Sequence, residues 1–313
     1  TMSTDEEAQT QDKLTQAQLT AIENEIKSTQ PLTSQLLPIS ALLHQYSNNT
    51  DDTGEQHQSA GFIQSAQFLS TKYKSLRRVR GDGNCYYRAF LYSLCEHLLL
   101  NNNENNKTGV SKKEFSRIKK TIADSLKWVC QFGYEEMTID MFHEELVELF
   151  DFIETSFTAT TDKSTTDNDT LQQQQLHGKL NEENSTSDYC TWYLRVLTAA
   201  QMKSNPDRFL PFLLANDDNI NMMDIPTFCS REVEPMGKEC GMVTVAALAE
   251  CLGVKVVIEY MDGRCGSGGE VVNHVFGQID VENSGGDGKE EEVEDDRICL
   301  TLLYRPGHYD ILY

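Results

Sequence analysis

The segment GDGNCYYRAF, residues 81–90, joins a tight turn to the beginning of an apolar helix. Glycine tolerates positive φ, and Asp and Asn bond their own backbone, so residues 82–84 are typical of a turn. The apolar positions that follow, up to Leu100, have the spacing of a helix packed into a core. Cys85 is therefore predicted in the first turn of that helix.

A cysteine at the beginning of a helix is well placed for nucleophilic chemistry. The unpaired N–H groups and the dipole of a helix N-terminus stabilise a thiolate, which is the reactive form of the side chain. The same N–H groups, with those of the turn, can bind the oxyanion of a tetrahedral intermediate. We therefore predict that Cys85 is a nucleophile, although free cysteines are often plain buried apolar residues.

A matching base lies at the other end of the chain, in the segment YRPGHYDILY, residues 304–313. The Pro-Gly pair separates two strand-like runs, which predicts an antiparallel hairpin. Alternate residues of a strand share a face, so His308 and Asp310 point the same way. Asp310 can then hold one imidazole nitrogen and leave the other for Cys85, as nucleophilic catalysis requires.

Five segments carry a resemblance to a known family: DGNC at 82–85, YRAF at 87–90, REVEPM at 231–236, EYMD at 259–262 and LYRPGHYDILY at 303–313. In these segments the chain resembles the otubains, which are ovarian-tumour-domain (OTU) cysteine peptidases that remove ubiquitin. The last segment is long and nearly gap-free and therefore specific, whereas DGNC marks only the wider superfamily. The resemblance extends from about residue 30 to the C-terminus and is interrupted by insertions.

The resemblance implies a role for each matching residue. Cys85 corresponds to the nucleophile, His308 to the general base and Asp310 to its orienting acid. Asp82 would shape the oxyanion loop, or it could simply cap its turn. The implied reaction is hydrolysis of isopeptide bonds between ubiquitin and lysines, or within polyubiquitin, through a thioester on Cys85.

Contacts to ubiquitin are expected at five further positions: Gly83, Asn84, Glu232, Glu234 and Met242. The two glutamates could pair with arginines in the tail of ubiquitin or remain solvated at a helix end. Where otubains have a Ser-Asp-His-like segment, residues 240–242 of this chain read Cys-Gly-Met. This departure affects the expected ubiquitin-contact surface and leaves a different ubiquitin-like modifier open as substrate.

The apolar patterning predicts an α+β fold with a small, mostly antiparallel sheet flanked by many helices, and the resemblance implies the papain-like OTU architecture. Strands are expected at 254–260, 298–304 and 308–313. Helices are expected near 14–30, 36–43, 62–73, 85–100, 111–129, 137–157, 192–197 and 243–252.

Residues 1–60 are predicted as an N-terminal arm, partly disordered and then helical, and residues 61–313 as the catalytic domain. Two polar segments without apolar periodicity, 159–187 and 283–297, are predicted as disordered insertions.

The composition restricts the partners and the compartment. A net charge of −22 argues against nucleic acid, because phosphate binding needs clustered cations. The chain has no run of roughly 18 apolar residues and no basic-then-apolar leader. Its nine cysteines lack the spacing of a disulfide framework or a zinc site. We expect a monomer of the cytoplasm, or of the nucleus, that binds no membrane and needs no metal or cofactor.

A second function, from another class, remains open at this stage. Otubains also restrain ubiquitin-charged conjugating enzymes without cutting, using the N-terminal arm together with the domain. In this chain Leu14, Ile22 and Ile26 share a helical face that could order on a ubiquitin surface. We rank the peptidase first because every residue of the implied triad is present.

Overall fold

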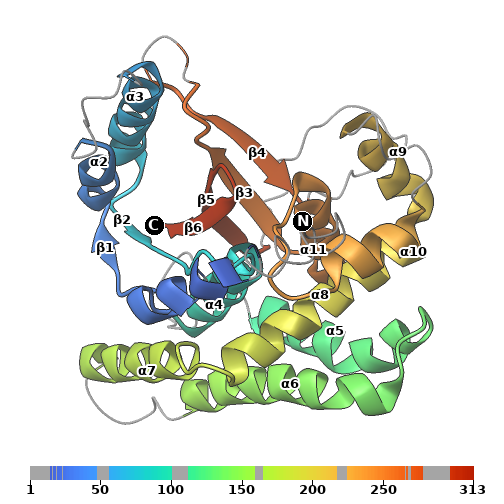
Figure 1. The fold of residues 1–313 in the computed structure, drawn as a ribbon. Helices are drawn as coiled ribbons and strands as arrows, with labels where there is room; N and C mark the ends of the chain where they lie inside the picture. The colour runs from blue at the N-terminus through green and yellow to red at the C-terminus, as the bar shows by residue number, and fades with distance from the viewer. Residues whose placement is uncertain are drawn as a thin grey trace, which may run out of the picture.

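The computed structural model describes residues 15–47 apart from 16, 19 and 23, and then 56–100, 112–158, 165–216, 224–264, 266, 269–277 and 297–313. Within these ranges one mixed sheet is covered by helices, with α4 lying between the sheet and the helices α5 to α8 (Figure 1). This arrangement places the beginning of α4 beside the last strand of the chain.

In the described part of the chain, six strands form one sheet in the order β1-β2-β6-β5-β3-β4. The strands are β1 Leu37–Pro38, β2 Ser75–Arg77, β3 Lys255–Tyr260, β4 Val272–Phe276, β5 Cys299–Arg305 and β6 His308–Leu312. All neighbours pair antiparallel except β3 with β5, which are parallel. The prediction of a small, mostly antiparallel sheet is confirmed.

The predicted hairpin is present as β5 and β6. Arg305 is the register partner of His308, and Leu303 is the partner of Asp310. Gly307, in the connecting turn, has φ +73°, a conformation that side chains with a Cβ rarely adopt. The turn therefore fixes His308 as the first residue of β6.

Three strands were not predicted. Strands β1 and β2 have only two and three residues, which is too short for an alternating pattern to be recognised. Strand β4 is mostly exposed and lies in a segment where the sequence predicts no element. Its backbone pairs with β3 from Val256 to Tyr260.

The helices are α2 Ser40–Ser47, α3 Gln56–Lys72, α4 Cys85–Leu100, α5 Lys112–Cys130, α6 Glu136–Thr158, α7 Thr165–Lys179, α8 Thr186–Ser204, α9 Pro206–Asn216, α10 Ile225–Phe228, the π-helical turn η2 Cys229–Val233, and α11 Met242–Leu252. Residues 24–29 are also helical. Gly253 ends α11 with φ +60°, as expected for a C-cap glycine. None of the described helices combines the length and apolar content needed to cross a membrane.

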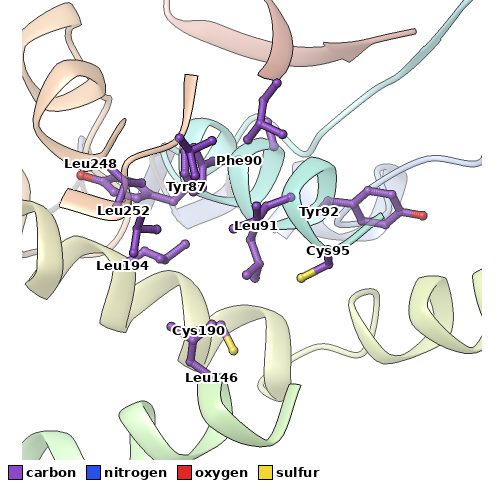
Figure 2. Close-up of a cluster of buried hydrophobic side chains, with 14 of the residues drawn as sticks. Tyr87, Phe90, Leu91, Tyr92, Cys95, Leu146, Cys190, Leu194, Leu248 and Leu252 are labelled. Carbon is purple, nitrogen blue, oxygen red and sulfur yellow. The ribbon is translucent and has the colours of Figure 1, made fainter. Parts of the chain in front are cut away.

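Helix α4 forms the centre of the main core. Tyr87, Phe90 and Leu91 of α4 lie among Leu194 of α8 and Leu248 of α11, and all of them are buried (Figure 2). Burying an apolar side chain of this size contributes about 1.5–3 kcal/mol relative to leaving it exposed. The nucleophile candidate therefore begins a helix in which 14 of the 16 residues are buried.

The prediction of a disordered insertion at 159–187 is wrong for its described part. Residues 165–179 form α7, and α8 begins at Thr186. Leu176 is only 1% exposed and belongs to the main core, and α7 packs against α4. Few apolar residues of this polar segment are buried, so no periodicity is visible, but tertiary packing overrides the weak local signal. Residues 159–164 and 283–296 lie outside the described residues.

Part of the segment predicted as an N-terminal arm is packed into the folded body. Ile39 and Leu42 are buried in a second core with Leu69 and Leu312, although they belong to the region assigned to the arm. Thr33 also forms a β-bridge with Val79. The chain from about residue 30 to the end of α2 is therefore part of the folded body.

Candidate active site

The turn before α4 can be formed only with glycine at position 83. Gly83 has φ +76°, and a Cβ added there would lie 2.0 Å from the carbonyl oxygen of Gly237. The turn therefore packs directly on the loop that contains Gly237. Cys85 follows as the first residue of α4 and is 3% exposed.

Asp82 is held inside this turn. Its Oδ1 accepts the Asn84 backbone N–H at 3.0 Å and a bond from Arg88 Nη1 at 2.6 Å. The other amino group of Arg88, Nη2, donates to Asp188 Oδ1 at 2.7 Å. Asp82 thus caps the turn and also ties it to α4 and α8.

His308 and Asp310 point the same way along β6, as expected for alternate residues of a strand. His308 Nε2 lies 3.0 Å from Asp310 Oδ1, which also accepts the backbone N–H of Val79 at 2.9 Å. Asp310 is completely buried, and its Oδ2 accepts a bond from Arg305 Nη2. Burial alone would raise the pKa of Asp310. The hydrogen bond to His308 and the charge of Arg305 outweigh burial and lower the pKa below its usual value, so the carboxylate is ionised.

The imidazole of His308 carries a proton at neutral pH. Burial lowers the pKa of His308, but the hydrogen bonds to Asp310 and Cys85 outweigh it and raise the pKa to about 9. Both ring nitrogens are then donors. Since Nε2 is bonded to Asp310, Nδ1 is the nitrogen that remains for the Cys85 sulfur. The structure thus brings Cys85 together with His308 and Asp310, which lie more than 220 positions further along the sequence.

A cavity of about 710 Å³ adjoins His308. Its lining includes Gly81 before the turn, Tyr46 of α2, Arg78, and Arg305 beside the β5–β6 turn. A group that receives a proton from His308 therefore has space on this side of the imidazole.

Arg195 is a site residue that the sequence analysis missed. It is 1% exposed, and its Nη2 donates to Gly83 O at 2.8 Å, to Asn84 Oδ1 at 2.9 Å and to Lys238 O at 2.7 Å. Its Nη1 donates to Val233 O at 2.9 Å. The sequence did contain a signal for Arg195: it is a charged residue among the apolar side chains of α8, and a buried charge needs partners.

Asn84 completes this link. Its side-chain Oδ1 also accepts the backbone N–H of Gly237 at 2.9 Å. Arg195 and Asn84 together therefore join the turn to residues 233–238. The Asn84 side chain is committed to this internal bond network.

The other predicted contact residues lie in different surroundings. Glu234 Oε1 accepts bonds from Tyr134 OH and Lys203 Nζ, both at 2.7 Å, so this carboxylate is paired inside the molecule. Glu232 is exposed and lies 3.4 Å from Lys238 Nζ.

Met242 begins α11 and lines a groove of about 330 Å³ between α9, α11 and β4. The groove also includes Phe212 and Val275, which are exposed apolar side chains. The position where this chain departs from the otubain pattern therefore lies on an apolar surface.

Five of the other cysteines have thiols whose pKa is raised by burial. The eight cysteines within the described residues are all free. Burial raises the pKa of Cys240 to about 12 and that of Cys251 to about 12 as well. In the same part of the chain, no group of three or more His, Cys, Asp or Glu side chains is arranged to hold a metal ion.

Sequence comparison assigns nearly the whole chain to one family. Residues 25–313 match the family model described as Peptidase C65 Otubain. Human ubiquitin thioesterase OTUB1 is 34% identical over 302 residues, which are 96% of this chain and 90% of that protein. The OVARIAN TUMOR DOMAIN-containing deubiquitinating enzyme 1 of Arabidopsis thaliana is 31% identical over 278 residues, 88% of this chain and 78% of that protein.

Structural comparison agrees. The solved structure of h/ceOTUB1 with ubiquitin aldehyde and UBCH5B~Ub has a TM-score of 0.72 and 26% sequence identity, and covers 97% of this chain and 98% of its own. The expected papain-like OTU fold is thereby confirmed. With a matching family model over residues 25–313 and a relative 34% identical along almost its full length, this chain belongs to the otubain family of peptidases.

Proposed function

We propose that this chain cleaves ubiquitin from lysine amines, with Cys85 as nucleophile, His308 as general acid and base, and Asp310 as the group that orients His308. The observation that carries the proposal is the His308–Asp310 pair, 3.0 Å apart, whose imidazole interacts with the cysteine that begins α4. Relatives named ubiquitin thioesterase and deubiquitinating enzyme support ubiquitin as the substrate.

In the proposed first step, the Cys85 thiolate attacks the carbonyl carbon of the last glycine of ubiquitin. The N-terminal N–H groups of α4 and of the turn stabilise the oxyanion that forms. The C–N bond then breaks, and the proton on His308 Nδ1 passes to the departing lysine amine. A thioester between ubiquitin and Cys85 remains.

In the second step, His308 is neutral and takes a proton from water, which attacks the thioester carbonyl. The C–S bond breaks, and the new carboxylic acid releases its proton to solvent, so ubiquitin leaves with a free carboxylate. Cys85 returns as a thiolate beside the imidazolium, so protons and electrons balance over the cycle. Asp310 accepts a hydrogen bond from Nε2–H throughout, without taking the proton, and keeps Nδ1 directed to the sulfur.

The cavity and the groove near the site indicate how the substrate would be oriented. The proton donor must face the leaving amine, so the lysine side of the bond belongs in the cavity next to His308. The apolar groove at Met242 is a candidate surface for the body of ubiquitin.

Hydrolysis of ubiquitin carrying a C-terminal fluorogenic amide tests the proposal. Wild-type protein should release the fluorophore, and Cys85→Ser should release none. Cys130→Ser, which changes a free thiol of α5, is the matched control and should keep wild-type activity. Full activity in Cys85→Ser would refute the assignment of the nucleophile.

A second function is binding of a ubiquitin-charged conjugating enzyme. It is supported by the similarity, over 97% of this chain, to h/ceOTUB1 in a structure that also contains UBCH5B~Ub. Deleting residues 1–24 removes most of the arm, including Leu14 and Ile22, but keeps the bond from Arg80 Nε to Gln30 O. The deletion should abolish inhibition of ubiquitin conjugation and spare hydrolysis of the fluorogenic substrate. Inhibition that survives the deletion would contradict a role of the arm.

A further inference from the structure

We propose that Arg305 is a positioning residue of the catalytic centre, which holds Asp310 in the orientation that His308 requires and connects it to α2. The inference rests on the proposed function, since it concerns the same three residues. It adds a fourth side chain, supplied by the end of β5, whose effect passes through Asp310.

The carboxylate of Asp310 has a complete set of partners only when Arg305 is present. Its Oδ1 is taken by Val79 N–H and His308 Nε2, and its Oδ2 is bonded by Arg305 Nη2. Asp310 is 0% exposed, so in the intact structure no solvent reaches Oδ2. A buried carboxylate that loses a charged partner carries a large free-energy cost. It is expected to relieve that cost by rotating or by taking up a proton.

Arg305 is itself anchored on the opposite side of the site. Its side chain is 13% exposed, and Nη1 donates to Gln45 Oε1 of α2 at 3.3 Å. Burial lowers the pKa of Arg305, but the charge of Asp310 and the neighbouring Tyr46 raise it overall, so the guanidinium is cationic. The planar fork thus spans from Asp310 to α2, a geometry that a lysine cannot reproduce.

Two consequences of removing Arg305 have opposite signs at His308. Loss of a nearby cation alone would make the imidazolium easier to form and raise the pKa of His308. Loss of the oriented Asp310 would lower the pKa of His308, because the hydrogen bond that Nε2 donates to Asp310 is the main interaction that raises it. A positioning role therefore predicts a lower pKa, which is the opposite of a purely electrostatic role.

The first measurement is an NMR titration of His308 in the wild type and in Arg305→Met, with the signal assigned by its loss in His308→Gln. We expect the Arg305→Met midpoint to move to lower pH. An unchanged or higher midpoint would overturn the proposal. This measurement needs no ubiquitin, so it decides the role of Arg305 even if the wild type hydrolyses no ubiquitin and the proposed function fails.

The second measurement is a double-mutant cycle on hydrolysis of the fluorogenic ubiquitin substrate. Arg305→Met should lower kcat by about 10- to 100-fold, as loss of an orienting partner does elsewhere, with little change in KM. In an Asp310→Ala background, the same change should cost almost nothing further. An equal loss in both backgrounds would show that Arg305 acts independently of Asp310 and would refute the proposal.

Two more variants separate positioning from stability. Arg305→Lys keeps a cation and can offer a donor to Oδ2 but cannot also bond Gln45, so it should recover part of kcat; a Lys variant as slow as the Met variant would contradict the account. Arg117→Met is the matched control, because Arg117 pairs with Glu114 and with the carbonyls of Leu252 and Gly253. It should lower the melting temperature without moving the His308 titration.

Discussion

The two halves of the candidate site are held by arginines in different ways. On the nucleophile side, Arg195 donates to three backbone carbonyls and to the amide oxygen of Asn84. On the base side, Arg305 binds a carboxylate that in turn binds an imidazolium. Arg195 therefore bonds to neutral acceptors, whereas Arg305 bonds to an ionised carboxylate that is itself bonded to the base. We expect changes in the first half to affect geometry and stability, and changes in the second half to affect the pH dependence as well.

The largest effect on either half of the site is expected when the reacting group itself is removed. Cys85→Ala or His308→Ala should lower kcat by at least about 10⁴-fold, because the nucleophile and its base act as one unit. Binding of ubiquitin should persist, since neither change alters the surrounding surface. Single-turnover cleavage and calorimetric titration of ubiquitin measure the two properties. Residual turnover near the wild-type level in either variant would contradict the assignment.

Arg195→Met tests the nucleophile half. It leaves up to three buried carbonyl oxygens without a donor, each of which costs about 1–3 kcal/mol, and it weakens the link between the Gly83 turn and residues 233–238, where Asn84 Oδ1 keeps its bond from Gly237 N–H. We expect a marked loss of thermal stability and a fall in kcat of about 10²-fold, the cost typical of one misplaced oxyanion donor. The pH profile of the remaining activity should match the wild type. A shifted pH profile in Arg195→Met would contradict the proposed difference between the nucleophile half and the base half.

The stability of the base half should depend on pH. His308 has a pKa of about 9 in the folded protein against 6.5 for an unperturbed histidine, so the folded state binds its proton more tightly. This contribution is complete below pH 6.5 and is lost as the pH rises through 9; about 3 kcal/mol is its upper bound. Urea unfolding at several pH values should show the decline in the wild type and a smaller decline in His308→Gln. Parallel curves for the two proteins would contradict the raised pKa.

The smallest effects are expected outside both halves. Glu234→Ala leaves Lys203 and Tyr134 without their shared acceptor, which should cost about 1–2 kcal/mol of stability. Its effect on kcat should stay within about threefold, because the side chain is paired away from the reacting groups. Thermal denaturation and steady-state kinetics measure both quantities. A large rise in KM with unchanged stability would instead indicate a direct contact to the substrate.

The parts of the site that could be predicted are those with local signals. The turn residues before Cys85, the alternation of His308 and Asp310, and the Pro-Gly hairpin each depend on neighbours in the sequence. The resemblance to the otubains joined these segments into one site. Glycine at 83 was also recognisable as a turn residue, although its close approach to Gly237 was not.

The parts that could not be predicted depend on contacts between distant residues. Arg195 and Asn84 are 111 positions apart, and Val79 and Asp310 are 231 apart. The periodicity of neighbouring residues does not indicate which distant residues will contact each other. Helix α7 was missed for a related reason, because Leu176 is buried by tertiary packing on α4 in an otherwise polar segment.

The central claim is that one thiol, Cys85, attacks the C-terminus of ubiquitin with the help of His308. The most direct measurement is reaction of the protein with ubiquitin that carries a C-terminal cysteine-reactive group, followed by mass-spectrometric mapping of the modified residue. The account predicts one ubiquitin per chain, attached to Cys85, with the reaction lost in Cys85→Ser and slowed in His308→Ala. Attachment at another cysteine, or no attachment to the folded protein, would contradict it.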